Sequence, residues 1–351
     1  MTAMDVSNSR AEAPRLPQFR VTLNARCGRA CFFCRPSGEA VATAPGSELA
    51  VDDLIAVAAQ VRAVGIDSIK LTGGDPALYE PLEVAVRRLH REVGFSEIEI
   101  ISRHPRIGER AERLASLGVT QFNMSIDTLD PHLHSELCGV DDLPQVIGAL
   151  QRCVQTGVPV KVNTVVMGGI NDEEVASLAD FCSRNGIRTL KLLDVIKDLD
   201  EGAESFARRL AIRRGKTLRD LYTPLEVFAE RFAAVAVKQE VITQGGLGHP
   251  MTAITLPTGL RLMLKDSKAG AWYGPVCNGC PFYPCHDALM ALRLTADLRL
   301  QYCLLRQDNT VDLAGLVTDE DRLRDCVHGA IAPYTQAEFR TSARLSLEVG
   351  A

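Results

Sequence analysis

QFRVTLNARCGRACFFC, residues 18–34, joins a strand-like run to three closely spaced cysteines. The run QFRVTLNA has the alternating pattern of a half-buried strand. Cys27, Cys31 and Cys34 follow it in the spacing C-x3-C-x2-C. Loops after the strands of a parallel α/β barrel form its active site. This segment therefore predicts a first barrel strand with a reactive loop directly after it.

Five further strand-like segments follow along the chain. They are SIKLTGG from Ser68, EIEIISR from Glu97, QFNMSID from Gln121, VKVNTVVMG from Val160 and RTLKLLDV from Arg188. Amphipathic helical stretches such as VDDLIAVAAQVRAVG separate them, and several end at a glycine suited to a helix C-cap. Six βα repeats predict a parallel sheet with right-handed crossovers. The regular repeat favours an α/β fold with a partial (β/α)6 TIM-like barrel, and a doubly wound sheet is the alternative.

The pattern changes after Ile196, which divides the chain into four parts. We expect a disordered tail at 1–16, a partial barrel at 17–196, a helical connection at 197–246 and a smaller C-terminal α+β domain at 247–351. Thr223 before Pro224 predicts the start of the clearest helix in the connection. A strand pair is expected between Ile254 and Leu264.

Composition argues against several classes of protein. The 351 residues have a net charge of −5 and no long basic run, so a nucleic-acid polymer is not an expected partner. No stretch approaches the roughly 20 apolar residues of a membrane span, so no membrane partner is expected either. The N-terminal residues lack the apolar core of a secretory signal, and we expect a cytoplasmic protein.

The chain contains 11 cysteines, which in a cytoplasmic protein favours metal binding or catalysis over a disulfide framework. Three lie in the first loop, and four more form a second group between residues 277 and 303. The remaining cysteines are isolated in sequence, and we interpret them as small buried hydrophobic residues. They are Cys138, Cys153, Cys182 and Cys326.

Three thiolates on one short loop suit an iron–sulfur centre. A 4Fe–4S cluster normally takes four cysteines, so three leave one iron with an open position for a substrate or cofactor. The alternative is zinc, but structural zinc sites are usually closed by four ligands. The turn LTGGDP, Leu71–Pro76, ends the second strand, and its two glycines let the backbone come close to a ligand.

Together these motifs resemble the radical SAM superfamily, whose members carry C-x3-C-x2-C after the first barrel strand and a GGEP-like turn after the second. The resemblance implies that Cys27, Cys31 and Cys34 hold a catalytic 4Fe–4S cluster. It also implies that the open iron binds S-adenosylmethionine (SAM). The implied reaction cleaves SAM reductively to methionine and a 5′-deoxyadenosyl radical, which abstracts a hydrogen atom from a substrate.

The resemblance further implies which residues contact SAM. Gly73, Gly74 and Asp75 match the turn that holds its amino group. Ser125, in NMSID at the fourth strand, matches a serine that binds its carboxylate. Phe33, between the second and third cysteines, matches an aromatic position that packs near the adenine.

The second cysteine group lies in PVCNGCPFYPCHDALMALRLTADLRLQYC, with Cys277, Cys280, Cys285 and Cys303 as candidate metal ligands. By chemistry alone, four thiolates suit a structural zinc site as well as an iron–sulfur cluster. The run RLTAD…C resembles the tail of the MoaA-like branch, the molybdopterin-precursor GTP cyclases. There, three cysteines hold a second, auxiliary 4Fe–4S cluster whose open iron faces the substrate. The C-x2-C-x4-C spacing also resembles the twitch or SPASM tails of peptide-modifying relatives.

The tail departs from the cyclase pattern at Cys285. A longer segment separates Cys280 from Cys303 than in relatives, and Cys285 lies within it. If Cys285 is a fourth ligand, the auxiliary cluster is closed and serves electron transfer or structure. If it is not, the open iron is available to the substrate.

Basic residues supply the expected substrate contacts. The resemblance implies this role for Arg20 before the first cysteine, Lys70 before LTGG, Lys161 in VKVN and Arg293 in RLTAD. Cations that converge on one cavity suit a phosphorylated substrate.

Other GTP-specific features differ. The second tail arginine of the cyclase is Ala291 here. A threonine-containing turn is replaced around Ile101–His104. The chain ends in Val349-Gly350-Ala351, where the cyclase ends in Gly-Gly. The anion-binding set is therefore partly kept while the GTP-specific parts are altered.

The leading hypothesis is a radical SAM enzyme that acts on a small phosphorylated or nucleoside-like molecule. Cyclisation, rearrangement or related carbon-skeleton chemistry is expected, in natural-product biosynthesis by family analogy. An electron donor such as flavodoxin or ferredoxin is the expected protein partner. The alternatives are a peptide-modifying radical SAM maturase and a non-enzymatic iron–sulfur or zinc protein. The lost arginine and the different C-terminus disfavour a true GTP cyclase.

Overall fold

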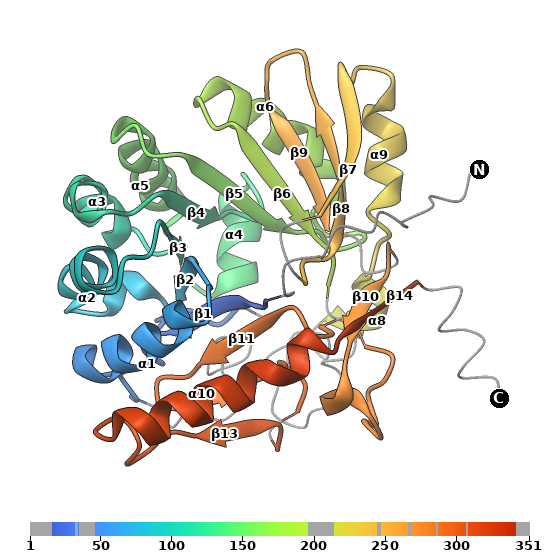
Figure 1. Cartoon of the computed structure of the whole chain (residues 1–351). Helices are drawn as coiled ribbons and strands as arrows, with labels where there is room; N and C mark the ends of the chain where they lie inside the picture. Colours follow the sequence, from blue (N-terminus) through green and yellow to red (C-terminus); the bar gives the residue numbers. More distant parts are fainter. Residues whose placement is uncertain are drawn as a thin grey trace.

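The computed structural model describes residues 16–31, 34, 46–195, 214–243, 247–265, 269–285, 287–306 and 308–341. The tail expected at residues 1–16 lies outside this set except for Leu16, and so does Phe33. The described residues form a curled sheet flanked by helices (Figure 1).

Six parallel strands form the centre of the sheet, and each was expected from its sequence pattern. Neighbouring strands pair in register, so that Arg20 lies opposite Lys70, which in turn lies opposite Glu99. Because all six run in the same direction, their carboxyl ends meet at one edge of the sheet. The strands are β1 (Gln18–Thr22), β2 (Ser68–Thr72), β3 (Glu97–Ser102), β4 (Gln121–Ser125), β5 (Val160–Val165) and β6 (Thr189–Leu193).

Strands from the C-terminal part of the chain extend this sheet at both edges. β9 (Arg261–Lys265) pairs parallel with β6, and β11 (Ala291–Leu294) pairs parallel with β1. Antiparallel strands continue outward, namely β8 (Pro250–Thr255), β7 (Lys238–Thr243), β12 (Arg299–Gln301) and β13 (Thr310–Asp312). The resulting sheet has 12 strands. Its curled parallel centre confirms the expected partial TIM-like barrel and not the doubly wound alternative.

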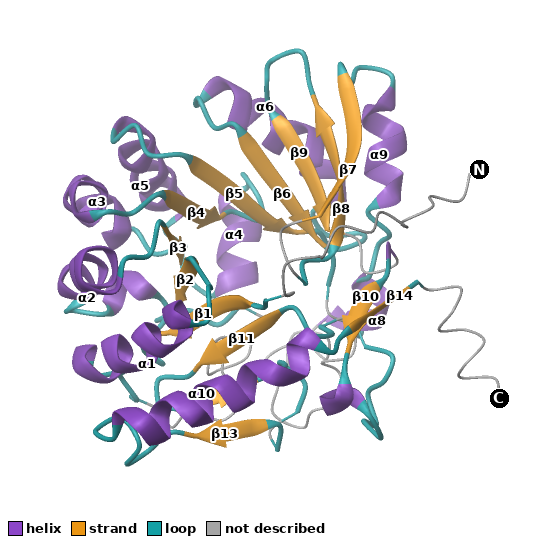
Figure 2. Ribbon diagram, in the orientation of Figure 1, coloured by secondary structure: helices purple, strands orange, loops and turns teal. Residues whose placement is uncertain are grey.

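Helices cover the outer face of the curl, as Figure 2 shows in purple. Helix α4 is placed differently, because its last carbonyl, Cys138 O, accepts a hydrogen bond from Ala30 N in the cysteine loop at 2.9 Å. It therefore lies at the carboxyl edge of the strands. The helices of the barrel are α1 (Val51–Ala63), α2 (Leu82–Arg88), α3 (Arg106–Leu117), α4 (Pro131–Cys138), α5 (Leu143–Gln155) and α6 (Val175–Arg184).

Alternation along the strands separates an apolar side from a polar one. In β1, Phe19 and Val21 are fully buried and belong to the main hydrophobic core, together with Leu54 of α1. Arg20 lies between them in sequence and therefore on the opposite, inner side of the sheet. The core thus packs between sheet and helices, and many of the polar side chains of the strands lie on the inner side.

The C-terminal residues are joined to the barrel more closely than the sequence suggested. Strands β8, β9 and β11–β13 all lie within residues 247–351, yet they belong to the main sheet at its two edges. Helix α10 (Glu320–Thr335) packs against α1, and β10 (Ala271–Tyr273) pairs antiparallel with β14 (Glu338–Arg340).

The helix expected to begin at Pro224, with Thr223 as its N-cap, begins two residues later, at Glu226. The described part of the connection contains α8 (Leu218–Leu221) and α9 (Glu226–Ala233). Thr217 caps α8 through a capping box with Asp220, and α9 begins only after Leu225. In the described part of the chain, no helix is both long enough and apolar enough to cross a membrane.

Candidate active site

The cysteine loop leaves β1 at the carboxyl edge of the sheet. Ala25 N donates to Ser47 O at 2.9 Å, which fixes the start of the loop. Cys31 is buried, Cys27 and Cys34 are half-buried, and Cys34 N donates to Cys31 O at 3.0 Å. None of the three is in a disulfide. Three free thiols on one short turn are a donor set that fits an iron–sulfur cluster with one open iron.

The two glycines of the LTGGDP turn allow the end of β2 to lie directly against the start of the cysteine loop. Gly74 N donates to Asn24 O at 2.7 Å, and the next residue, Asp75, donates to Arg26 O at 2.7 Å. A Cβ at Gly74 would overlap Arg26 O, and one at Gly73 would lie 2.9 Å from Asn24 O. Only glycine permits this approach without a backbone shift. The glycines therefore hold the cysteine loop in place, and their contact to SAM stays a prediction.

Asp75 is buried, and its carboxylate joins the turns that follow β2 and β3. It accepts hydrogen bonds from Ser102 Oγ (2.6 Å), Ala77 N (3.0 Å), Arg103 N (2.9 Å) and His104 N (3.2 Å). This carboxylate is therefore occupied by donors of the chain itself. Its contact to the amino group of SAM stays a prediction.

A buried ion pair lies beside the cysteine loop. Arg103 Nη2 donates to Asp127 Oδ2 at 2.8 Å, with side chains that are 12% and 3% exposed. Although burial opposes it, the charges of Cys31 and Asp127 raise the pKa of Arg103. Burial raises the pKa of the Cys31 thiol, and the charge of Arg103 opposes this shift and so favours the thiolate, which is the form that binds metal. Ser125 ends β4 at the same edge, opposite Asn163, and its contact to SAM stays a prediction.

Arg29, within the cysteine loop, anchors that loop to the turn between α4 and α5. Its side chain is 2% exposed and donates to both oxygens of Asp142, from Nη1 to Oδ1 at 2.9 Å and from Nη2 to Oδ2 at 2.6 Å. Nη2 also donates to Arg103 O at 3.2 Å. The next residue, Ala30, donates from its backbone N to Cys138 O at the end of α4. Arg29 and Ala30 therefore attach the cysteine loop to α4 and to the turn that follows it.

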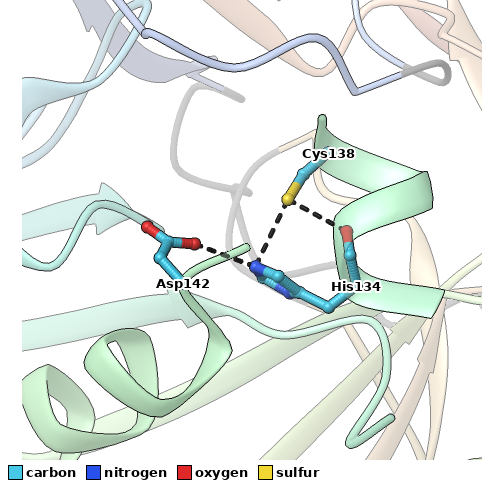
Figure 3. Close-up of side chains that lie close together, drawn as sticks. All are labelled: His134, Cys138 and Asp142. Carbon is cyan, nitrogen blue, oxygen red and sulfur yellow. Dashed lines mark hydrogen bonds and ion pairs between the residues drawn. The ribbon is translucent and has the colours of Figure 1, made fainter. Parts of the chain in front are cut away.

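Figure 3 shows His134, Cys138 and Asp142 close together at this anchor. His134 Nε2 lies 3.0 Å from Asp142 Oδ1 and 3.3 Å from Cys138 Sγ. Their ligand atoms all lie within 4.8 Å of one another, which makes the group a candidate metal site. However, Arg29 engages both oxygens of Asp142 and its Nη1 lies 3.5 Å from Cys138 Sγ, so a metal cation would be repelled. We interpret the group as part of the anchor.

The isolated cysteines were mostly interpreted correctly. Cys138, Cys153 and Cys182 are fully buried, as expected, whereas Cys326 is only half-buried. The sequence pattern did not predict the polar contacts of Cys138 or a role for His134. Their spacing of four residues on a helix was the available signal, because it places both side chains on one face.

Six cationic side chains lie on the inner side of the sheet. Each occupies a position that alternates with buried apolar residues of its strand. Four were expected from the sequence and two, on β6 and β9, were missed. They are Arg20, Lys70, Lys161, Lys191, Lys265 and Arg293.

Mutual repulsion among these cations is evident in their pKa values. Burial is the largest cause that lowers the pKa of Lys191 well below its ordinary value. The positive charge of Lys265, followed by those of Lys161, Lys70 and Arg20, lowers this pKa further. Burial also lowers the pKa of Lys265, where Asp194 opposes the shift, and that of Lys161, where Glu99 opposes it. An anionic group placed among these lysines would restore their charge, so the inner side favours an anionic ligand.

Lys70 is already paired within the chain. Its Nζ donates to Glu99 Oε2 at 3.1 Å, and the same oxygen accepts from Gln121 Nε2 at 3.1 Å and from Asn123 Nδ2 at 2.9 Å. Lys70 and Glu99 also line a pocket at the amino ends of the strands, together with Gln18. Its substrate contact stays a prediction.

The second cysteine group surrounds one small cavity. Cys277, Cys280, Cys285 and Cys303 all line it, and none is in a disulfide. Cys280 N donates to Cys277 O at 3.1 Å, which closes the C-x2-C turn. The structure therefore brings the four expected thiols together, and this set fits a metal centre with thiolate ligands.

Arg293 connects this region to the barrel. Its side chain is 2% exposed, and Nη2 donates to Asp287 Oδ1 at 3.2 Å. The other oxygen of Asp287 accepts from Leu304 N at 2.5 Å. Two residues before Arg293, Ala291 is fully buried and its carbonyl accepts from Tyr334 Oη at 2.9 Å. A substrate contact by Arg293 stays a prediction.

Known proteins resemble this chain in sequence. Residues 21–182 match the family described as the Radical SAM superfamily. A probable GTP 3′,8-cyclase of Pyrococcus abyssi is 28% identical over 84% of this chain and 87% of its own length. A probable GTP 3′,8-cyclase of Saccharolobus islandicus is 27% identical over 87% of this chain and 88% of its own length.

Solved structures share the fold. SuiB of Streptococcus suis superposes with a TM-score of 0.57 and 15% identity, over 89% of this chain and 66% of that protein. Native anSMEcpe with bound AdoMet superposes with a TM-score of 0.52 and 12% identity, over 90% of this chain and 82% of that protein. At these identities the likeness concerns the fold, and it agrees with the curled half-barrel described above. The twitch or SPASM assignment of the tail stays a prediction.

The superfamily match and the GTP 3′,8-cyclase relatives also define the cofactors. Radical SAM proteins bind SAM and a 4Fe–4S cluster, and the MoaA-like relationship adds a second 4Fe–4S cluster. Residues 21–182 therefore match a radical SAM domain, and the cyclase relatives support an enzyme of the MoaA-like type.

Proposed function

We propose that this enzyme uses SAM to generate a 5′-deoxyadenosyl radical and abstracts a hydrogen atom from a small phosphorylated or nucleoside-like substrate. Cyclisation or rearrangement of the carbon skeleton is the expected outcome. The observation that carries the proposal is the cationic inner side of the half-barrel. The strands that carry these cations end at the edge of the sheet that holds the cysteine loop. A phosphate group is the kind of ligand that such a set of cations recognises.

Cys27, Cys31 and Cys34 are assigned to the first cluster. When bound, the reduced cluster supplies one electron that breaks a carbon–sulfur bond of SAM and releases methionine. The chain supports this chemistry by fixing the position of the cysteine loop. Gly74 contributes because its backbone lies directly against Arg26 O of that loop. The Arg103 guanidinium beside the loop offsets the negative charge of the thiolates.

The substrate is assigned to the inner side of the sheet. Arg20, Lys161, Lys191 and Lys265 are the cations whose charge an anionic substrate would restore or balance. Ala291 replaces an arginine expected for a GTP cyclase, which supports a substrate other than GTP. A low-potential donor such as flavodoxin or ferredoxin is proposed as the source of electrons.

The test is formation of 5′-deoxyadenosine by anaerobically reconstituted, dithionite-reduced protein with SAM, with and without a panel of nucleotides and sugar phosphates. The Cys27/Cys31/Cys34→Ala triple variant should form none, while Cys326→Ala, a control outside both cysteine groups, should match the native protein. Each active phosphorylated compound is then compared with its dephosphorylated form, which should stimulate cleavage less. Equal product from the native protein and the triple variant would refute the assignment of the cluster. Equal stimulation by the phosphorylated and dephosphorylated forms would refute the substrate class.

A further inference from the structure

We propose that Cys285 is a fourth thiolate ligand of the second cluster, so that this cluster is closed and has no open iron for the substrate. The inference rests on the proposed function, because it concerns how the MoaA-like tail takes part in the reaction. Its consequence is that the anionic group of the substrate is bound by the cations of the inner side and not by iron.

The cavity itself supports this assignment. Its described lining contains the four cysteines and no histidine, aspartate or glutamate. The thiols are therefore the strong metal ligands of this lining. In a three-thiolate cluster, Cys285 would remain as an idle thiol in the same cavity as an iron with an open position. Thiolate is the ordinary protein ligand of cluster iron, so we expect Cys285 to fill that position.

The local backbone holds Cys285 as a hydrogen-bond acceptor. Ala288 N donates to Cys285 Sγ at 3.4 Å, and Tyr273 Oη donates to Cys285 O at 2.8 Å. Ala288 has a φ of 51°, a left-handed conformation that is uncommon for residues other than glycine. Backbone strain of this kind persists where the surrounding structure requires it, and it clusters at functional sites. Here it accompanies a hydrogen bond to sulfur, which is a common way for proteins to tune cluster ligands.

The carboxylates beside the cavity are not rival ligands. Asp287 follows Cys285 by two residues, but its oxygens accept from Arg293 Nη2 at 3.2 Å and from Leu304 N at 2.5 Å. Arg306 also lines the cavity, and its Nη1 donates to Val276 O at 3.3 Å. Its Nε and Nη2 donate to the two oxygens of Asp308 at 2.9 and 2.7 Å, so this second carboxylate is occupied as well.

The experiment isolates the second cluster in the full-length Cys27/Cys31/Cys34→Ala variant, reconstituted anaerobically. We expect about four irons per chain, as a 4Fe–4S cluster held by four cysteines requires. Addition of ¹³C-cyanide, which binds an open cluster iron, should produce no ¹³C coupling in the ENDOR spectrum of the reduced cluster. Adding Cys285→Ala should open one iron, so that cyanide coupling appears and mild oxidation produces a three-iron signal. Cys326→Ala, on α10, should leave both readouts unchanged.

Several outcomes would overturn the proposal. Cyanide coupling in the variant that keeps Cys285 would show an open iron, and this measurement does not depend on how well the Cys285→Ala protein folds. Zinc in place of iron would refute the cluster itself. An unchanged spectrum in Cys285→Ser, where a hard oxygen replaces the sulfur, would show that residue 285 is no ligand. None of these readouts uses SAM cleavage or substrate, so their failure is distinguishable from failure of the proposed function.

Discussion

Breaking the Arg29–Asp142 pair should both destabilise the protein and impair loading of the first cluster. Asp142→Asn removes the charge that faces Arg29, whose side chain is 2% exposed, and leaves the guanidinium buried without its carboxylate. Removing one member of a buried pair costs roughly 3–5 kcal/mol. Because the Asp142 side chain is 16% exposed, we expect the low end, about 3 kcal/mol, or a loss in Tm on the order of 5 °C.

A double-mutant cycle separates the pair from general damage. Arg29→Met alone should cost a similar amount, but the Arg29→Met/Asp142→Asn double variant should cost about 1–3 kcal/mol less than the sum of the two single changes. The exposed pair Arg106–Glu80 is the control, and Glu80→Gln should leave the stability close to that of the native protein. Thermal unfolding is followed by circular dichroism, and iron is counted after anaerobic reconstitution.

Two results would contradict this reasoning. Strictly additive effects in the cycle would mean that Arg29 and Asp142 do not act together. Full iron loading of Asp142→Asn despite a lowered Tm would mean that the anchor stabilises the fold without positioning the cysteine loop.

Three further predictions concern the same regions. Although burial opposes it, hydrogen bonds with Cys138 and Asp142 raise the pKa of His134, so its protonated form stabilises the fold below a pH of about 6.5. The stability difference between the native protein and His134→Gln, measured by urea titration, should therefore shrink as pH rises through the raised pKa; an increase with pH would contradict this. Gly74→Ala should lower iron loading severely, while Gly148→Ala, whose Cβ would meet no atom closer than 3.7 Å, should not; equal loading of both variants would refute the close approach. Lys191→Met should raise the Tm of the ligand-free protein, because it removes a buried cation with a lowered pKa, and should weaken binding of pyrophosphate in calorimetry. Native binding should weaken as pH rises above the lowered pKa, and pH-independent binding would argue against the lysines.

Much of the candidate site follows from short-range patterns. The strand alternation around Phe19 and Val21, the spacing of the first three cysteines and the glycine pair at the end of β2 each depend on a few neighbouring residues. The structure confirms all six predicted strands and the turn at the end of β2. The reason for the glycines was incomplete, because Gly74 is required by the Arg26 carbonyl of the neighbouring loop.

Helix boundaries were less predictable. Thr223 and Pro224 form a reasonable local start signal, yet the capping box of Thr217 and Asp220 begins a separate short helix first. The observed helix α9 then begins at Glu226, two residues after Pro224.

Residue types at short, regular spacings were enough to predict the six barrel strands, two cysteine groups as candidate metal ligands and the relationship to radical SAM enzymes. Which distant groups meet became visible only in the folded chain. Arg29 and Asp142 are 113 residues apart, and β9 and β11 join opposite edges of one sheet. Lys191 and Lys265 have no distinguishing pattern in the sequence, and the pairing of β6 with β9 brings them together on one face of the sheet. The physical reason is that burial and repulsion of a charge depend on what surrounds it in space, and no local pattern records that.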